Sequence, residues 1–311
     1  EVNAAGPESE TTARELASAF TDYLRACRAD EHALSTLPPG RFLMPGDLEG
    51  SPALTFAPLA WPEGPGVTAG RTLFQMMERR YEAYKDVVVR PFFRDHFARL
   101  DRQIVLVDAL TALNAGAGAV KDLETALVDI LACFRTGQAT WLSSLIGRRI
   151  DRIVFAATKA DHLHQSSHDR LELILKRLVR RASERAEFSG AAVDVIALAA
   201  VRATREAMVK HDGATLPAIL GVPLPGETMD GETFDGKGEI AVFPGDLPTD
   251  IDGLFGAVDG ATTETAPVIS PLRFLRFKPP KLEVSPDGVT LSLPHIRLDK
   301  ALQFLLGDKL A

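Results

Sequence analysis

The sequence predicts an α/β protein built around a doubly wound parallel sheet. Three short, continuously apolar segments at residues 104–108, 152–157 and 193–198 indicate strands that are buried on both faces. Between them lie two stretches with helical periodicity, at about residues 121–146 and 168–187. The order strand, helix, strand, helix, strand is the one that produces a parallel sheet with helices packed on its faces.

The N-terminal third of the chain is expected to be mainly helical. Residues 10–29 have the periodicity of an amphipathic helix, whereas residues 37–65 are rich in proline and glycine and predict an ordered loop or a hinge. A long helix should follow at about 71–99, with Thr68 as its cap. Pro91 lies inside that helix and should kink or divide it, because proline cannot donate the backbone hydrogen bond.

From about residue 212 onward, loops rich in proline and glycine surround short candidate strands. The candidates are Glu239–Phe243, Leu272–Phe277, Lys281–Val284 and Val289–Leu293. A Ser-Pro-Asp-Gly turn separates the last two, which predicts a hairpin. Residues 295–310 should close the chain as a short amphipathic helix.

The length and composition are those of an ordinary globular protein with one large domain or about two domains. The 311 residues are 46% hydrophobic and 25% charged, and the formal charge of −7 argues against a nucleic-acid partner, which needs a basic face. No apolar run approaches the ~20 residues of a transmembrane segment. Cys27 and Cys133 suggest neither a disulfide framework nor a metal site. The start at Glu1 has no initiator methionine or signal peptide, so we expect a truncation point there.

Thr158-Lys159-Ala160-Asp161 directly follows the predicted strand 152–157 and precedes a predicted helix. A T/N-K-x-D sequence at the carboxyl end of a buried parallel strand is typical of GTPases that read guanine. The carboxylate of Asp161 can accept from the two donors on the edge of guanine, while the stem of Lys159 packs over the ring. Adenine lacks this pair of donors, so the carboxylate selects against adenine by losing its partners.

The turn after the third predicted strand supplies a second candidate contact. GTPases place an S-A-[KL]-like turn at this position, and its backbone N–H contacts the guanine oxygen. Because the backbone makes that contact, alanine in place of serine at Ala199 is compatible with it. The predicted base-contacting residues are therefore Thr158, Lys159, Asp161, Ala199, Ala200 and Val201.

Neither glycine-rich segment of the sequence fits a phosphate cradle. Residues 231–238 nearly match G-x-x-x-x-G-K-[ST], but Gly238 replaces the hydroxyl that would hold Mg²⁺ and a strand-like segment follows. Residues 114–118 lack the third glycine of G-x-G-x-x-G. We expect a surface loop at the first segment and a flexible helix entry at the second.

Two further groups of polar residues are expected to be structural. Asp108 ends the strand 104–108, which fits the position between a Mg-site strand and the guanine-motif strand, so Asp108 should not be the Mg-site carboxylate. His162, His164 and His168 are three of the seven histidines, but they lack a nearby cysteine. A solvated loop is the expected setting of these histidines, and no metal site is predicted.

Five stretches spread over most of the chain carry a family resemblance. They are Pro39–Leu48 (PGRFLMPGDL), Ser51–Phe56 (SPALTF), Asp101–Asp108 (DRQIVLVD), Phe155–His162 (FAATKADH) and Leu293–Asp299 (LPHIRLD) continuing through Gly307–Leu310 (GDKL). In this order they resemble the YcjX-like family of bacterial stress-associated P-loop NTPases.

The resemblance implies a Ras-like GTP/GDP-binding domain with an inserted helical domain. It also implies a cytoplasmic protein of envelope-stress operons, and it allows a peripheral position at the inner membrane with a membrane-protein partner. The family's Walker A sequence and its D-x-P-G magnesium motif are not found in this sequence, and both are expected upstream of Glu1. Mg²⁺ and GTP hydrolysis are therefore expected only together with those motifs.

The predicted organisation has three parts. Residues 1–100 should be the remainder of a helical insertion with its Pro/Gly-rich loop, residues 101–215 an incomplete Ras-like α/β core, and residues 216–311 a C-terminal α+β extension packed on that core. No catalytic residue is identified, and Arg41 and Thr55 are candidates for contacts on the phosphate side.

The predicted function is a guanine-nucleotide-binding switch of the bacterial stress response, which hydrolyses GTP as a complete protein but not as this chain alone. Two alternatives stay open. One is a nucleotide-independent scaffold that keeps the fold and has lost the site. The other is an ATP-using relative, for which Thr158 in place of asparagine is the hint.

Overall fold

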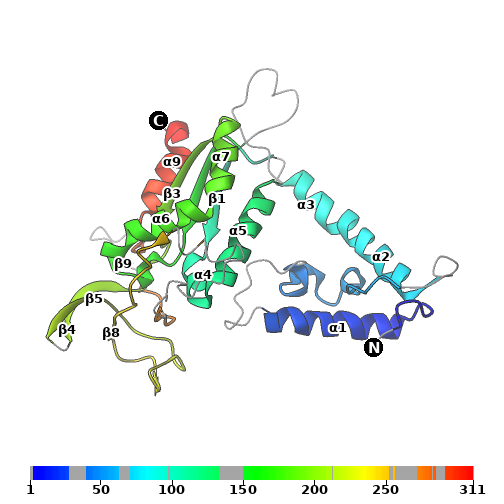
Figure 1. Cartoon of the computed structure of the whole chain (residues 1–311), viewed down its shortest axis with the longest axis horizontal. Coiled ribbons are helices and arrows are strands. Elements are labelled where there is room, and N and C mark those ends of the chain that lie inside the picture. The colour runs from blue at the N-terminus through cyan, green and yellow to red at the C-terminus, as the bar shows by residue number, and fades with distance from the viewer. Residues whose placement is uncertain are drawn as a thin grey trace. The chain divides into compact units, whose positions relative to one another are not determined.

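The computed structural model forms two compact units, Glu1–Arg99 and Leu100–Ala311, which are described separately (Figure 1). The residues that the structure describes are 3–27, 40–62, 71–96, 99–132, 150–211, 213–251, 255, 272–281, 283–284 and 291–310.

The first unit is built from helices. The predicted first helix is confirmed as α1 (Glu10–Cys27), and the proline- and glycine-rich stretch holds three single-turn 3₁₀ helices rather than a long element. The next helix, α2, spans Leu73–Tyr84. Its N-cap is Thr72, which forms a capping box with Gln75. The predicted cap at Thr68 is therefore wrong, and Thr68 itself lies outside the described residues.

Pro91 divides the long helix as predicted. A π-helical turn at Lys85–Val89 follows α2, and α3 (Arg90–Asp95) begins with Pro91 in its first turn. Proline cannot donate to the carbonyl four residues earlier, and its ring crowds that carbonyl. The π turn absorbs this mismatch, because it widens the helix just before the proline.

An aromatic cluster forms the core of the first unit. The ring of Phe42 makes edge contacts with Phe20 and Phe56, at centroid distances of 5.3 and 5.0 Å. Phe56 also lies 5.3 Å from the ring of Tyr84 on α2. The loop that carries Phe42 and Phe56 is therefore held by packing against both helices rather than by regular secondary structure.

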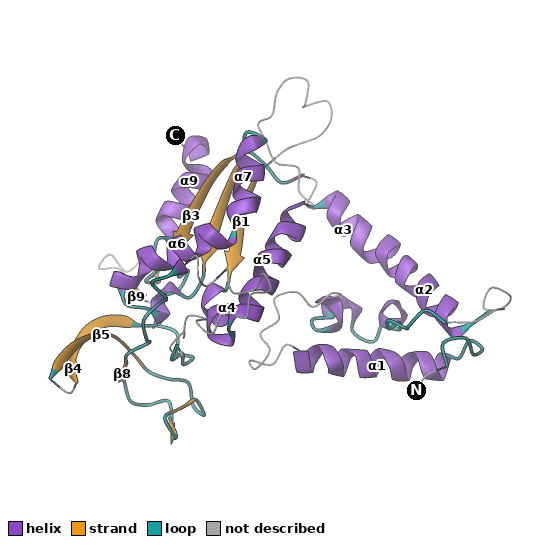
Figure 2. Cartoon of the chain, in the orientation of Figure 1, coloured by secondary structure: helices purple, strands orange, loops and turns teal. Residues whose placement is uncertain are grey.

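The second unit contains the predicted parallel sheet. Its strands β1 (Arg102–Val107), β2 (Arg152–Ala157) and β3 (Ala192–Ala197) pair in the order β1-β2-β3. All pairs are parallel and in register, so that Val107, Ala157 and Ala197 end the strands side by side. These three strands confirm the predicted α/β fold class (Figure 2).

Helices cover both faces of this sheet. On one face, Ile153 and Phe155 pack with side chains of α4 (Ala109–Ala115), α5 (Ala117–Ala132), α6 (His168–Leu178) and α7 (Arg180–Phe188). On the other face, Val154 and Ala156 pack against α9 (Leu298–Leu310). Alternate residues of β2 thus point to opposite helical layers, which explains its continuously apolar sequence.

Helix α4 is a departure from the predicted pattern. The helix after the first strand was predicted to begin at about residue 121, whereas α4 begins directly after Asp108. Asp108 is the N-cap of α4, because its carboxylate accepts from the N–H of Thr111 at 3.2 Å. Gly116 ends α4 with a φ of 97°, so the expected flexible entry is a junction between two helices.

A smaller antiparallel sheet follows the core, with β4 (Arg205–His211), β5 (Ala214–Gly221) and β8 (Ile240–Val242) in the order β4-β5-β8. Two short two-stranded pairs accompany it, β6 (Thr228–Met229) with β7 (Glu232–Thr233) and β9 (Glu283–Val284) with β10 (Leu291–Ser292). The β9–β10 pair confirms the arms of the predicted hairpin, whose turn lies outside the described residues. Strand β5 spans residue 216, where the sequence placed a domain boundary. That boundary stays a prediction.

The predicted strand Leu272–Phe277 is wrong. In this stretch only Phe277 forms a β-bridge, to Pro223, and the remainder is extended loop. Its apolar residues face different neighbours: Leu272 belongs to the core of the parallel sheet, whereas Leu275 and Phe277 pack with β5 and β8. A segment that divides its side chains between two cores resembles a strand in sequence without pairing like one.

Candidate functional site

The candidate site lies at the carboxyl ends of the parallel strands. The N–H of Thr158 donates to the carbonyl of Val107 at 2.9 Å, and the N–H of Leu198 donates to the carbonyl of Ala157 at 2.8 Å. These bonds extend the strand pairing by one residue beyond the sheet. The two predicted base-contacting segments therefore begin side by side, at the edge where open α/β sheets bind ligands.

A tight turn then separates Lys159 from Asp161. Lys159 has a left-handed backbone with a φ of 62°, which is uncommon for a residue with a side chain. The N–H of Ala160 donates to the carbonyl of Leu198 at 3.1 Å and fixes the turn against the neighbouring strand. A single 3₁₀ turn, Ala160–His162, follows and carries Asp161.

The carboxylate of Asp161 is buried but is not neutralised by a cation. Asp161 is 6% exposed, and its Oδ2 accepts a hydrogen bond from the N–H of Ala203 at 2.9 Å. The carbonyl of Asp161 also accepts from the hydroxyl of Thr204. Among the described residues, no lysine or arginine forms an ion pair with Asp161, and Oδ1 accepts no hydrogen bond. The carboxylate is thus held in place with acceptor capacity left.

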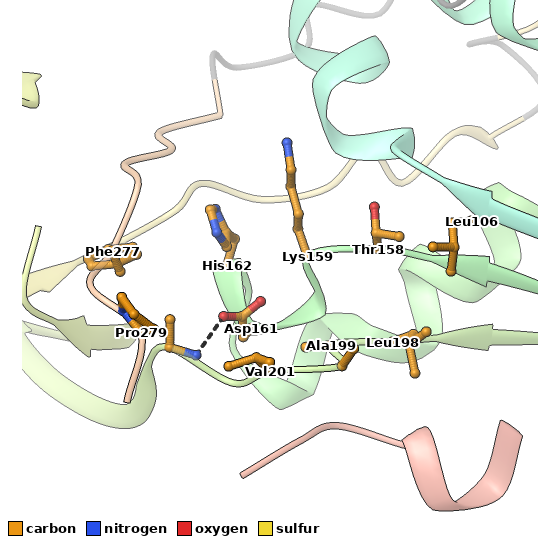
Figure 3. Close-up of a pocket in the computed structure, with 12 residues that line it drawn as sticks. Leu106, Thr158, Lys159, Asp161, His162, Leu198, Ala199, Val201, Phe277 and Pro279 are labelled. Carbon is orange, nitrogen blue, oxygen red and sulfur yellow. Dashed lines mark hydrogen bonds between the residues drawn. The ribbon is translucent and has the colours of Figure 1, made fainter. Parts of the chain in front are cut away.

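A pocket of about 350 Å³ adjoins this carboxylate (Figure 3). All six predicted base-contacting residues line it. The side chain of Lys159 extends beyond the pocket toward α4, where Nζ lies 2.6 Å from Oδ2 of Asp108 and 3.2 Å from Oγ1 of Thr111. The remaining lining residues are mainly apolar and include Leu106, Leu198, Phe277 and Pro279. A small apolar pocket with few, fixed polar groups is a common form of ligand site.

The turn at Ala199–Val201 contributes less than predicted at its first residue. The N–H of Ala199 donates to the carbonyl of Ile296 at 3.1 Å, and the N–H of Ile296 donates to the carbonyl of Ala199 at 2.8 Å. That amide is therefore committed to a β-bridge. The N–H groups of Ala200 and Val201 make no hydrogen bond within the described part of the chain, so these two are the available donors of the turn.

Two of the three clustered histidines are not in a solvated loop, so that prediction is wrong. His168 is 4% exposed, and its Nε2 lies 2.9 Å from the carbonyl of Ala160. The ring of His162 lies 5.8 Å from Phe274 and 5.9 Å from Phe277, and its buried Nδ1 has no partner among the described residues. Burial lowers the pKa of both His162 and His168.

The histidines do not form part of a metal cluster in the described residues, where no group of three or more metal-ligating side chains converges. Their role is instead to support the turn that carries Asp161. His168 anchors the carbonyl of Ala160 from the next helix, and His162 fills the space between that turn and two phenylalanines. The sequence showed only the polarity of these residues, which does not distinguish a ligand from a packed imidazole.

The other polar candidates lie away from this pocket or are already engaged. Residues 231–238 comprise the short strand β7 and the surface loop that leads to β8, with the side chain of Lys237 86% exposed. Arg41 bonds Pro45 and Asp47. Thr55 bonds Pro52 and receives a hydrogen bond from Arg80. The last two candidates belong to the first unit, and their proposed phosphate contacts stay a prediction.

A parallel sheet with helices on both faces and a pocket at its carboxyl edge defines an α/β protein with a ligand site at its strand ends, an arrangement consistent with a P-loop NTPase-like fold. The chain belongs to the YcjX-like family, DUF463, whose profile matches residues 1–310. This membership confirms the family resemblance in the sequence.

Two curated relatives support the assignment. One, named Ras-like GTPase YcjX, comes from Escherichia coli (strain K12) and is 37% identical over 310 residues, which are 98% of this chain and 61% of the relative. Another of the same name, from Shewanella oneidensis, is 34% identical over 283 residues, which are 88% of this chain and 53% of the relative. The chain thus spans between half and two thirds of the length of these relatives. Among the described helices, none has the length and apolar character of a membrane span.

Proposed function

We propose that this chain carries the base-recognition half of a guanine-nucleotide site, with Asp161 as the group that selects guanine. The observation that supports the proposal most strongly is the setting of the Asp161 carboxylate. It is buried beside a pocket, positioned by the Ala203 N–H, and unpaired with any cation among the described residues. A buried carboxylate without a cation is costly unless other donors reach it, and the edge of guanine offers two.

The remaining contacts divide the base between two segments. The stem of Lys159 offers an apolar surface to one face of the purine, since its ammonium group is held by Asp108. The free N–H groups of Ala200 and Val201 are donors suited to the carbonyl oxygen of guanine. Adenine would present one donor where guanine has a carbonyl, so both segments discriminate in the same direction.

For Mg²⁺, the described residues around the pocket do not fit a binding site. Asp108, the carboxylate that directly follows β1, caps α4 and pairs with Lys159. We therefore propose that GTP hydrolysis and Mg²⁺ binding belong to the complete protein, and that the 311 residues bind GTP or GDP weakly and do not hydrolyse GTP. The phosphates normally supply most of the affinity for a nucleotide.

The cellular location and the partner of the protein are also proposals. We propose a cytoplasmic switch protein of the bacterial stress response, peripheral at the inner membrane when it meets a membrane-protein partner. The family membership supports this proposal only through the resemblance already described. Two competing functions, a nucleotide-independent scaffold and an ATP-using relative, are outcomes of the test below.

The substitution Asp161→Asn tests the proposal, because an amide presents a donor to the base edge where the carboxylate presents an acceptor. Binding of GDP, ADP and xanthosine diphosphate should be measured by calorimetry on the full-length protein. We expect the affinity for GDP to fall by at least about tenfold. The affinity for xanthosine diphosphate, which has a carbonyl in place of the amino group, should rise. Asp169→Asn, on an exposed carboxylate of α6, is the control. No change with GDP would favour the scaffold, and preference for ADP in the unaltered protein would favour the ATP-using alternative.

A further inference from the structure

We propose that residues 272–281, here called the strap, form a wall of the base pocket and couple its occupancy to the small β4-β5-β8 sheet. The inference rests on the proposed function, because it assigns a role at the same pocket. Two strap residues, Phe277 and Pro279, line the pocket together with Asp161. Figure 3 shows them at the end of the pocket where Asp161 and His162 lie, with Thr158 and Leu106 toward the opposite end.

Backbone hydrogen bonds fix the strap along its length. At its beginning, the N–H of Leu272 donates to the side chain of Asn114 at the end of α4, at 3.0 Å. Further along, the N–H of Lys278 donates to the carbonyl of Val222 at 2.8 Å, and the N–H of Leu224 donates to the carbonyl of Arg276 at 2.8 Å. The strap therefore joins the core helix α4 to the segment that directly follows β5.

Phe277 is held by a close fit rather than by polar contacts. It is 8% exposed and packs with Ile219 of β5 and Val242 of β8. Gly221 leaves room for the ring, since a Cβ atom at that position would lie 2.6 Å from Cδ1 of Phe277. Such a contact is too short to be tolerated, so the position of the ring depends on the absence of a side chain at the end of β5.

His162 joins the strap to the guanine-reading turn. Its ring contacts those of Phe274 and Phe277 of the strap, at centroid distances of 5.8 and 5.9 Å, and it directly follows Asp161 in the chain. A shift of the strap therefore moves the residue next to the carboxylate. Conversely, a base in the pocket would contact Phe277 and Pro279 and hold the strap against the β5 segment.

The physical benefit of this wall is the exclusion of water from the base edge. Hydrogen bonds to a carboxylate gain strength in a low-dielectric setting. Apolar side chains beside Asp161 therefore increase the discrimination that its carboxylate exerts, in addition to contributing contact area. Lys159 cannot serve this purpose alone, because its ammonium group is drawn toward Asp108.

Two substitutions test the wall from opposite sides. Phe277→Leu removes part of the ring surface while keeping an apolar side chain. Gly221→Ala is a change outside the pocket lining, and its added Cβ atom displaces the ring of Phe277. The matched controls are Phe188→Leu, at a ring of α7 that is 95% exposed and does not line the pocket, and Gly238→Ala, where a Cβ atom meets nothing within 4 Å.

Binding of guanosine monophosphate to the 311-residue chain should be measured by ligand-observed NMR. We expect both test variants to weaken binding by about five- to tenfold, as for a partial loss of base contact, and both controls to bind within about twofold of the unaltered chain. Circular dichroism of each variant verifies folding. If Phe277→Leu alone failed to fold, Gly221→Ala would still decide the question, because it moves the ring of Phe277 without changing the identity of any residue that lines the pocket.

Hydrogen exchange supplies a readout of coupling. Guanosine monophosphate should slow exchange in peptides that contain Lys278 and Leu224, whose amides join the strap to the β5 segment, and this slowing should be lost in both test variants.

The outcomes are distinguishable. If the unaltered chain binds the nucleotide and all four variants match it, the strap proposal alone is overturned. If the unaltered chain shows no preference for guanosine over adenosine monophosphate, the proposed function fails and the strap proposal with it.

Discussion

Nζ of Lys159 lies 2.6 Å from Oδ2 of Asp108, so the loops after β1 and β2 are tied together at the edge of the sheet. The same carboxylate caps α4 through the N–H of Thr111. Asp108 therefore serves two structural roles with its two oxygens. The pairing also explains how Lys159 maintains a left-handed backbone, since its side chain and its following amide are both anchored.

The two roles of Asp108 can be separated by mutation. Asp108→Asn keeps an oxygen for the cap and loses the ion pair with Lys159, which is partly exposed, so we expect a loss of unfolding free energy of no more than about 1 kcal/mol. Asp108→Ala removes both, and should cost about 0.5–2 kcal/mol more. Urea denaturation followed by circular dichroism measures both values. Equal losses in the two variants would mean that the cap contributes nothing.

Acid should weaken the attachment of α9 to the sheet. The guanidinium of Arg102 pairs with Asp308, with Nη2 2.7 Å from Oδ2, and this pairing lowers the pKa of Asp308 to about 2. A carboxyl whose pKa is lower in the folded state stabilises the fold above its ordinary pKa of 3.8, and the benefit is lost as the pH falls toward 2. Thermal melts of Asp308→Asn across this range should show less acid dependence than the unaltered chain. Asp299→Asn, an exposed carboxylate of the same helix, should not change it.

His168 should make stability fall at mildly acidic pH. Burial lowers the pKa of this histidine below its ordinary value of 6.5, because the charged ring loses its hydration. The unfolded chain therefore takes up the proton first, so the free energy of unfolding should be highest above 6.5 and should decrease as the pH falls below it. His168→Gln should flatten this dependence in urea titrations at about pH 5.5 and 7.5. His164→Gln is the control, because among the described residues its ring bonds Ser166 alone. An unchanged slope in His168→Gln would refute the assignment.

The centre of the parallel sheet should be intolerant of cavities. Phe155 is fully buried on β2, among side chains from the helices on one face. Phe155→Ala should lower the free energy of unfolding by about 3–5 kcal/mol, because it removes apolar burial and leaves a cavity. Phe188→Ala makes the same chemical change at a ring that is 95% exposed and should have little effect. A small loss at Phe155 would show that the helices can close over the gap.

The strands of the core were the easiest part of the fold to predict from the sequence. Residues 152–157 are apolar throughout because they are buried on both faces, and β2 has these bounds in the structure. The β4–β5 hairpin was missed, although its Asp212-Gly213 pair is a typical hairpin signal. In β4 charged residues flank a short apolar run, and β5 includes Pro217 and ends at Gly221, so neither shows the alternation of a half-buried strand.

The site was predicted only where it depends on neighbouring strand ends. Thr158, Lys159, Asp161 and Ala199–Val201 line one pocket because parallel strands end in register, which the fold class already required. Their roles as base contacts stay predictions. Phe277 and His162 were not predicted as part of this region, since their contacts join segments more than 100 residues apart and leave no local pattern.

The attachment of α9 has a consequence for the order in which the protein folds during synthesis. Arg152 on β2 donates to the carbonyl of Phe304, 152 positions later in the chain. While the ribosome is still adding the intervening residues, Val154 and Ala156 face water on one side of the sheet. The nascent protein therefore exposes this apolar face until α9 emerges, and chaperones that shield apolar surface are most needed during that interval.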